Sequence, residues 1–144
     1  MTTIRQILEQ KGRNVITIAP DDTVYSALEK MAELDIGALV VAQDGRPVGL
    51  LGERDYAREV ILKGRSSLDT PVRDIMVKEL PIASPDQTVE TCMTTMTDKR
   101  IRHVLVMEGE HLVGLVSIGD LVKAVIDQQQ STIEQLVGYV SGSS

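Results

Sequence analysis

The feature that most constrains this chain is an internal repeat. The segment from Pro20 to Val24 reads PDDTV and recurs as PDQTV from Pro85 to Val89, an offset of 85 − 20 = 65 residues. At that offset, residues 15–61 and 80–126 share 13 identities in 47 ungapped pairs. Unrelated sequences of average composition would share roughly 3. Duplication is the simplest explanation, so we expect a fold of two similar halves.

Each half carries the hydrophobic patterns of an α/β unit. Apolar residues at intervals of three and four predict an amphipathic helix near residue 24 and another near residue 89. Short apolar runs follow, interrupted by the turn residues Asp44-Gly45 or Gly109-Glu110, which predicts a β-hairpin in each half. A short strand is expected before each amphipathic helix, near Ile16 and near Ile82. The apolar positions of the two helices are Val24, Ala27, Leu28 and Met31, then Val89, Cys92, Met93 and Met96.

A further helix is expected after each hairpin. It should begin near Asp55 in the first half and near Asp120 in the second. Its apolar side should include Val60-Ile61 or Val125-Ile126, and Lys63-Gly64 is a suitable C-terminal stop in the first half. Because a half of about 65 residues is marginal alone, we expect an α/β fold in which two β-α-β-β-α repeats pack through their sheets and share a core.

Short helical segments are expected before each repeat and at the C-terminus. Thr70 is placed to cap a helix over residues 70–76, with Pro71 at its first position, and residues 3–8 are its counterpart. Residues 131–134 match a capping box and predict a separate C-terminal helix to about Tyr139, before a loose tail. The expected organisation is repeat 1 over residues 1–68, repeat 2 over 69–130, and the C-terminal helix and tail over 131–144.

Composition excludes several functional classes. The 21 Asp and Glu outnumber the 15 Lys and Arg, a balance opposite to that of duplex nucleic-acid binders. Cys92 is the one cysteine and, with two histidines, cannot complete a four-ligand Cys/His zinc site, so no metal is expected. The N-terminus lacks the apolar stretch of a signal peptide and no apolar run reaches bilayer length. We therefore expect a cytoplasmic protein without a membrane partner.

The ordered motifs resemble the cystathionine β-synthase (CBS) domain, here as a tandem pair known as a Bateman module. The resemblance covers nearly the whole chain and implies a stand-alone module without a catalytic domain. It implies further that the cleft between the repeats binds an adenosine-containing ligand such as AMP, ATP, NAD(H) or S-adenosylmethionine, and that the pair dimerises. The motifs are Val72-Arg73-Asp74-Ile75-Met76, Asp21-Asp22-Thr23-Val24 and its copy, Arg102-His103-Val104-Leu105-Val106, and Gly114-Leu115-Val116-Ser117-Ile118-Gly119-Asp120.

The last of these motifs has a chemistry of its own. A strand ending at Val116 would turn at Ser117 into a helix, so the N–H groups of Ile118, Gly119 and Asp120 would face outward, where the helix dipole favours an anion such as phosphate. The Ser117 hydroxyl would add a donor, and the Asp120 carboxylate could accept hydrogen bonds from a ribose diol. The alternative is that Ser117 and Asp120 only cap the helix, because Ser-x-x-Asp is also a capping pattern.

The first repeat departs from this motif. It keeps Asp55 but has Gly52 where the family usually has Ser or Thr, so a hydroxyl donor is missing. Arg54 could replace that donor by neutralising phosphate, although Glu53 beside it opposes an anion. The alternative is that both charges are simply solvated.

By resemblance, the adenine base would contact the entry strand and the hairpin of each repeat. In the second repeat, Arg102 and His103 also belong to the one dense basic cluster of the chain. They would bring positive charge to phosphates, which favours AMP, ATP or NAD(H) over S-adenosylmethionine; alternatively, the cluster complements the C-terminus of the preceding helix. The base-contacting positions map to Thr17, Ile18, Gly37, Ala38, Ile82, Ala83, His103 and Val104.

The function predicted is that of a regulatory sensor, not of an enzyme. The chain has no P-loop, no nucleophile elbow and no H-E-x-x-H motif. We expect a homodimer, because Tyr56, Leu121, Val122 and Val125 should leave apolar surface uncovered. The alternatives are a ligand-free dimerisation module and an unrecognised nucleotide hydrolase. A sensor of this kind can regulate a protein partner, which the sequence does not identify.

Overall fold

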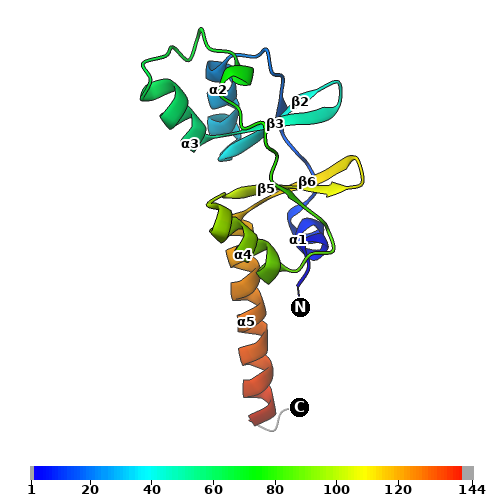
Figure 1. Ribbon diagram of the computed structural model, residues 1–144. Coiled ribbons are helices and arrows are strands. Elements are labelled where there is room, and N and C mark those ends of the chain that lie inside the picture. The colour runs from blue at the N-terminus through cyan, green and yellow to red at the C-terminus, as the bar shows by residue number, and fades with distance from the viewer. Residues whose placement is uncertain (1, 141–144) are drawn as a thin grey trace. The chain divides into compact units, whose positions relative to one another are not determined.

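The computed structural model describes residues 2–140, and the expected tail from 141 lies outside them. The described chain divides into two compact units (Figure 1). One comprises residues 14–81, and the other joins the residues up to Arg13 with those from Ile82 onward. Each unit contains one three-stranded sheet and its own hydrophobic core cluster.

The unit of residues 14–81 has the strand order β1-β2-β3. Strand β1 (Thr17–Ile18) pairs in parallel with β2 (Ala38–Gln43), which pairs antiparallel with β3 (Arg46–Gly52). In the hairpin turn, Asp44 and Gly45 both have positive φ, the conformation that this residue pair favours. The helical elements are α2 (Val24–Leu34), α3 (Glu53–Tyr56), the π-helix η1 (Ala57–Ile61) and the 3₁₀ helix η2 (Val72–Asp74).

The other unit repeats this sheet as β4-β5-β6, so the mixed α/β class and the duplication are confirmed. The register is conserved at the offset of 65: Ala38 pairs with Gly52 in the first sheet, and His103 pairs with Ser117 in the second. The strands are β4 (Ile82–Ala83), β5 (His103–Glu108) and β6 (His111–Ser117), and the helices are α1 (Ile4–Lys11), α4 (Val89–Lys99) and α5 (Ile118–Val140).

The amphipathic helices bury the faces that their periodicity predicts. In α2, Val24, Ala27 and Met31 lie in the core, and in α4 the matched Val89, Cys92 and Met96 do the same. A threonine caps each helix through the same contact. The Thr23 hydroxyl accepts a hydrogen bond from the Ser26 N–H, and the Thr88 hydroxyl accepts one from the Thr91 N–H. Cys92 is therefore a core residue, as expected.

The segments that precede the repeats are exchanged between the units. We call residues 2–8 and 70–76 the lead segments; they align at 70 − 2 = 68 residues, three more than the repeats. Residues 2–8 pack in the unit of the second repeat, and residues 70–76 pack in the unit of the first. Matched backbone hydrogen bonds hold them: Val89 N to Thr2 O, Ile4 N to Gln87 O and Arg5 N to Pro85 O on one side, and Val24 N to Thr70 O, Val72 N to Asp22 O and Arg73 N to Pro20 O on the other, all 2.8–2.9 Å.

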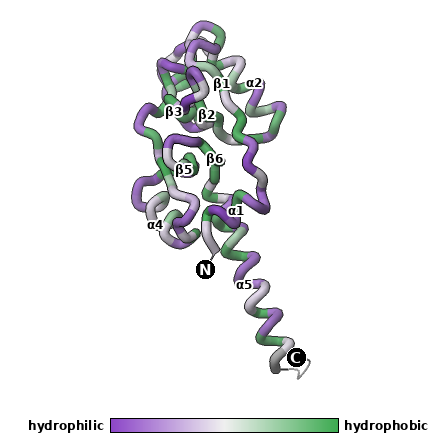
Figure 2. Tube along the Cα trace, turned by 90° about the vertical axis from the view of Figure 1, so that its right-hand side faces the viewer, coloured by the Kyte–Doolittle hydropathy of each residue, from purple (hydrophilic) through white to green (hydrophobic). Residues whose placement is uncertain are grey.

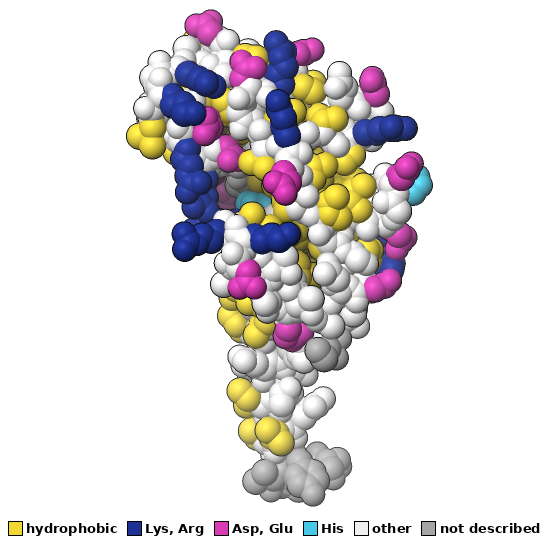
Figure 3. Space-filling model, viewed as in Figure 1, with side chains coloured by type: hydrophobic (Ala, Val, Ile, Leu, Met, Phe, Trp, Pro, Cys, Tyr) yellow, Lys and Arg dark blue, Asp and Glu magenta, His cyan; other side chains and the backbone are white. Residues whose placement is uncertain are grey.

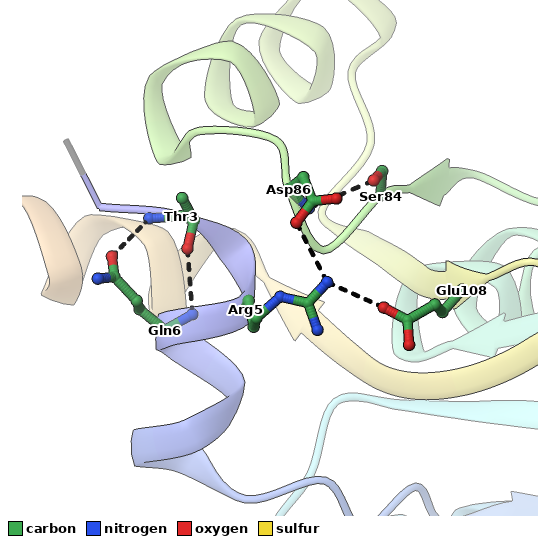
Figure 4. Close-up of polar contacts among 6 residues, drawn as sticks. All are labelled: Thr3, Arg5, Gln6, Ser84, Asp86 and Glu108. Carbon is green, nitrogen blue, oxygen red and sulfur yellow. Dashed lines mark hydrogen bonds and ion pairs between the residues drawn. The ribbon is translucent and has the colours of Figure 1, made fainter.

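An arginine in each lead segment repeats the exchange in side chains. The Arg5 guanidinium donates to Asp86 at 3.1 Å and to Glu108 at 2.9 Å (Figure 4). Arg73 pairs in the same way with Asp21, the residue that matches Asp86 in the first repeat. The repeats of the sequence and the compact units of the structure therefore do not coincide, and the boundaries 1–68 and 69–130 remain a statement about the sequence.

The two lead segments differ in conformation. In α1, the Thr3 hydroxyl accepts from the Gln6 N–H and the Gln6 side chain accepts from the Thr3 N–H, a complete capping box (Figure 4). The prediction that Thr70 caps a helix is wrong, because its hydroxyl donates to the Ser66 carbonyl at 2.7 Å and Pro71 is extended. Only the short η2 forms there.

The helices that close the repeats also differ from expectation. No proline or glycine interrupts α5 between Asp120 and Gly138, so it continues through Ser131, and the predicted separate C-terminal helix is wrong. In the first repeat, α3 instead continues as η1, which ends at Ile61, and the turn after it contains Gly64 with a φ of +68°. Val60 is buried as expected, but Ile61 and Ile126 are more than half exposed.

Candidate ligand-binding junctions

At the junction of β6 and α5, Ser117 and Asp120 form a capping box. The Asp120 N–H donates to the Ser117 hydroxyl at 3.1 Å, and the Ser117 N–H donates to Asp120 Oδ2 at 2.8 Å. The Ile118 N–H donates to the Arg102 carbonyl at 2.8 Å. Of the three amides expected to face an anion, only that of Gly119 has no acceptor among the described residues. The contacts of a helix cap are thus present, and the Ser117 hydroxyl can still donate its own proton.

Lys11 completes this junction, and the sequence reasoning missed it. Its ammonium group donates to Asp120 Oδ2 at 2.6 Å and to the Leu115 carbonyl at 2.8 Å. Lys11 lies in the last turn of α1, more than a hundred residues before its partners. No spacing in the sequence indicates this contact, because it depends on the exchange of the lead segments.

The charges around this junction shift two pKa values downward. Burial alone would raise the pKa of Asp120, but hydrogen bonds from Lys11 and from the Ser117 N–H outweigh it and hold the pKa below 3.8. Burial lowers the pKa of His103 below 6.5, and Lys11 and Arg102 lower it further, against the opposite effect of Asp120. The lowered pKa favours the neutral imidazole of His103, whereas Arg102 is exposed.

The matched junction of β3 and α3 has the same backbone and no such cation. The Gly52 N–H donates to Asp55 Oδ2 at 2.8 Å, and the Glu53 N–H donates to the Gly37 carbonyl at 3.2 Å. Burial raises the pKa of Asp55, and the Gly52 N–H and Arg58 only partly oppose this. Asp55 makes no ion pair within residues 2–140, and Arg54 is exposed.

The remaining predicted positions fall into two groups by burial. Thr17, Gly37 and Ile82 are exposed, and the Thr17 carbonyl accepts from Lys30 Nζ at 2.6 Å. The others are buried, so they can offer a ligand only their backbone groups: Ile18, Ala38, Ala83 and Val104. Strand pairing brings Ala38 next to Gly52 in one unit and His103 next to Ser117 in the other.

A small pocket borders Asp120 within its own unit. It has a volume of about 100 Å³ and is lined by Ile7, Gln10, Lys11, Asp120, Lys123, Ala124 and Asp127. No group of three or more His, Cys, Asp or Glu side chains suited to a metal ion is found among residues 2–140. Within that range, no helix is long and apolar enough to cross a membrane.

A family model of the CBS domain matches residues 4–62 and again residues 72–127. The chain belongs to the CBS domain family. Each of the junctions described above lies in one of the two matched regions, so the chain carries a tandem pair of CBS domains.

Similar proteins cover most of the chain. The CBS domain-containing protein CBSX3, mitochondrial, of Arabidopsis thaliana is 39% identical over 150 residues, which cover 98% of this chain and 73% of the relative. A structure of a protein with CBS domains from Burkholderia ambifaria MC40-6 is 46% identical with a TM-score of 0.86, covering 89% of this chain and 96% of the other.

A more distant structure contains ligands. The CBS domain pair of MJ0100 was solved in complex with 5′-methylthioadenosine and S-adenosyl-L-methionine. It is 20% identical to this chain, with a TM-score of 0.79, and covers 89% of this chain and 98% of its own. At this level of identity the similarity establishes the shared fold alone.

Proposed function

We propose that this CBS pair is a regulatory sensor that binds an adenosine-containing ligand, AMP, ATP or NAD(H), and signals by conformational change. The observation that carries the proposal is the placement of one carboxylate at each strand–helix junction. Backbone N–H groups fix Oδ2 of Asp55 and Oδ2 of Asp120, while Oδ1 of each has no hydrogen bond among the described residues. A fixed carboxylate with an open oxygen is suited to accept hydrogen bonds from a ribose diol.

The phosphate groups are proposed to lie near the second junction. The Ser117 hydroxyl and the Gly119 N–H would donate to a phosphate oxygen, and Arg102 would supply positive charge. His103 would act as a neutral hydrogen-bonding group, because its pKa is lowered. In the first repeat Arg54 offers positive charge, but Gly52 has no hydroxyl to match that of Ser117, so we expect tighter binding at Ser117 and Asp120.

A ligand-free interaction module is the second candidate. It is favoured by the capping box and by the ion pair with Lys11, which already use Oδ2 of Asp120. In that case the junctions would serve folding only, and the pair would act through assembly. Under either candidate we propose no catalytic role, no resident metal, a homodimeric assembly and a cytoplasmic location.

Mass spectrometry of freshly purified protein, followed by denaturation, separates the two candidates. The sensor proposal expects an adenine nucleotide to be released. Calorimetric titration with AMP, ATP, NAD(H) and S-adenosylmethionine should then give tighter binding for the phosphate-bearing ligands. If no nucleotide co-purifies and no ligand gives a heat of binding, the result supports the ligand-free module instead.

Matched variants assign the site. Asp120→Ala should weaken the tighter phase roughly tenfold to a hundredfold, because it removes a charged hydrogen-bond acceptor, and Asp55→Ala should affect only the weaker phase. Asp98→Ala, which removes a carboxylate from the exposed end of α4, is the control and should leave both phases unchanged. Loss of the tight phase in Asp55→Ala would reverse the ranking of the junctions.

A further inference from the structure

The C-terminal part of α5 carries an apolar stripe that its own unit leaves uncovered. We call residues 126–137 the distal segment. Its side chains at Ile126, Ile133 and Leu136 are 56%, 55% and 59% exposed. Figure 1 shows this part of α5, in orange and red, extending beyond α4 and α1 of the same unit, and Figure 3 shows hydrophobic side chains along it. Leu121, one of the residues expected to leave apolar surface, is instead fully buried.

The spacing of the stripe is that of a two-stranded coiled coil. Ile126, Gln129, Ile133 and Leu136 are separated by intervals of three, four and three residues. These intervals place Ile at two a positions and Leu at one d position, the combination that favours parallel dimers. Hydrophobic intervals recur along this part of the helix in Figure 2. Val122, four residues before Ile126, extends the stripe toward the core and is 42% exposed.

We propose that the distal segment packs in parallel against the same segment of a second copy of this chain. Gln129 would occupy a d position opposite the partner's Gln129. Each side-chain amide can both donate and accept, so the two amides can hydrogen-bond to each other. The flanking g and e positions are Thr132, Gln130 and Val137. Because none of these is charged, no like-charge repulsion opposes pairing of two identical helices.

The charge of this region argues against an anionic lipid surface. No Lys or Arg follows Lys123, and Asp127 and Glu134 are the only charged residues after it. Amphipathic helices that bind anionic membranes are rich in Lys and Arg on their polar face. A groove of about 430 Å³ also runs beside the stripe and offers space along which a partner helix can lie; it is lined by Glu90, Val125, Gln128, Gln129, Thr132 and Ile133.

The distal segment is short for a coiled coil, but it belongs to a helix that is already formed. An isolated helix as short as the distal segment would be marginal in water. Here the first part of α5 is held by the core through the fully buried Leu121, so little conformational entropy remains to be lost on association. The inference deepens the proposed homodimer by naming its surface, and it does not depend on any nucleotide.

Sedimentation and light scattering of the full chain over the micromolar range test the surface. We expect a reversible species of twice the 15.7 kDa chain mass. Ile133→Glu and Leu136→Glu should each weaken association roughly tenfold or more, because a carboxylate would be buried in the seam. The control Ser131→Glu adds the same charge at an f position, away from the stripe, and should leave the dimer intact.

A cysteine variant tests the orientation. In a parallel pair, Leu136→Cys places two thiols opposite each other, so oxidised glutathione should convert them to a disulfide-linked dimer, while Ser131→Cys should remain unlinked. Cys92 is buried and should not interfere. Absence of cross-linking at residue 136 would overturn the parallel arrangement.

Three other outcomes would overturn the proposal. A monomer at every concentration removes both the coiled coil and the proposed homodimer. A dimer that survives both glutamate variants removes the coiled coil but leaves a homodimer formed through another surface. Co-sedimentation of a monomer with phosphatidylserine vesicles, lost in Ile133→Glu, would assign the stripe to a membrane surface instead.

Discussion

At the end of β6 the Asp120 carboxylate meets the ammonium group of Lys11, whereas at the end of β3 the matched Asp55 carboxylate has no ion pair within residues 2–140. Both carboxylates accept the same backbone hydrogen bond, from Ser117 or from Gly52, at 2.8 Å. Their pKa values nevertheless move in opposite directions. The repeat therefore keeps the geometry of the junction, while Lys11, at the end of the helix that packs beside one of the two junctions, sets the difference in charge.

The same edge of the sheet shows how this difference arises. The Leu115 carbonyl on β6 accepts a hydrogen bond from Lys11, a side chain of α1. The matched Leu50 carbonyl on β3 accepts from the Val77 N–H at 2.8 Å, and Val77 in turn accepts from the Leu50 N–H. A helix thus brings a cation to one repeat, whereas an isolated β-bridge at Val77 brings a neutral backbone to the other.

The largest expected effect comes from removing a buried side chain of a lead segment. Ile4 and Val72 occupy matched, fully buried positions. Ile4→Ala should cost about 2–5 kcal/mol, and Val72→Ala less because it removes fewer methyl groups. Hydrogen exchange should show the loss of protection in β5 and β6 for Ile4→Ala, but in β2 and β3 for Val72→Ala. Loss in the repeat that follows each lead segment in the sequence would contradict the exchange.

A second pair of variants compares how closely the lead segments pack on the sheets. A Cβ added at Gly114 would collide with Leu8 of α1, and one added at Gly49 would collide with Met76. Gly114→Ala should destabilise by roughly 1–3 kcal/mol, and Gly49→Ala by less, since unbranched Met can move aside. Thermal unfolding of both variants measures the difference. Equal losses would show that Met76 is held as firmly as Leu8.

Local patterns predicted much of this fold, and the missing parts depend on distant contacts. The turn at Asp44-Gly45 and the buried face of α4 follow from short-range rules, and both are confirmed. The Ser131 capping pattern failed because nothing in the sequence stops α5 before it. The contact of Lys11 with Asp120 joins segments exchanged between repeats, so neither periodicity nor the offset of 65 could predict it.

Neutralising each carboxylate in turn should change the free energy of unfolding differently at the two junctions at neutral pH. Asp120→Asn should lose up to about 1 kcal/mol, because the pair with Lys11 is partly exposed, at 27% and 37% of the side chains. Asp55→Asn should be neutral or stabilising, since burial disfavours its charge and Asn can still accept from the Gly52 N–H. Denaturant unfolding at pH 7 is the measurement. A larger loss in Asp55→Asn would reverse the comparison.

The pH dependence of the same pair has opposite signs. The folded-state pKa of Asp120 lies below 3.8, so its stabilising contribution is present above 3.8 and is lost as the pH falls through the folded value. The folded-state pKa of Asp55 lies above 3.8, so its stabilising contribution is present below 3.8 and is lost as the pH rises through the folded-state pKa. Stability curves of the two Asn variants against the parent should therefore diverge in opposite directions on acidification.

The smallest expected effect is electrostatic and makes the two junctions alike. Lys11→Met removes the cation beside Asp120, so the pKa of Asp120 should rise toward the behaviour of Asp55. The pKa of His103 should rise as well, because Lys11 also disfavours the imidazolium. Carboxyl and imidazole chemical shifts followed by NMR during a pH titration report both values. Lys30→Met, which removes a lysine bonded to a carbonyl in the other unit, is the control and should move neither. If Asp120 kept its low pKa in Lys11→Met, the backbone N–H of Ser117 would be sufficient to hold it, and the absence of a cation would no longer explain why Asp55 differs.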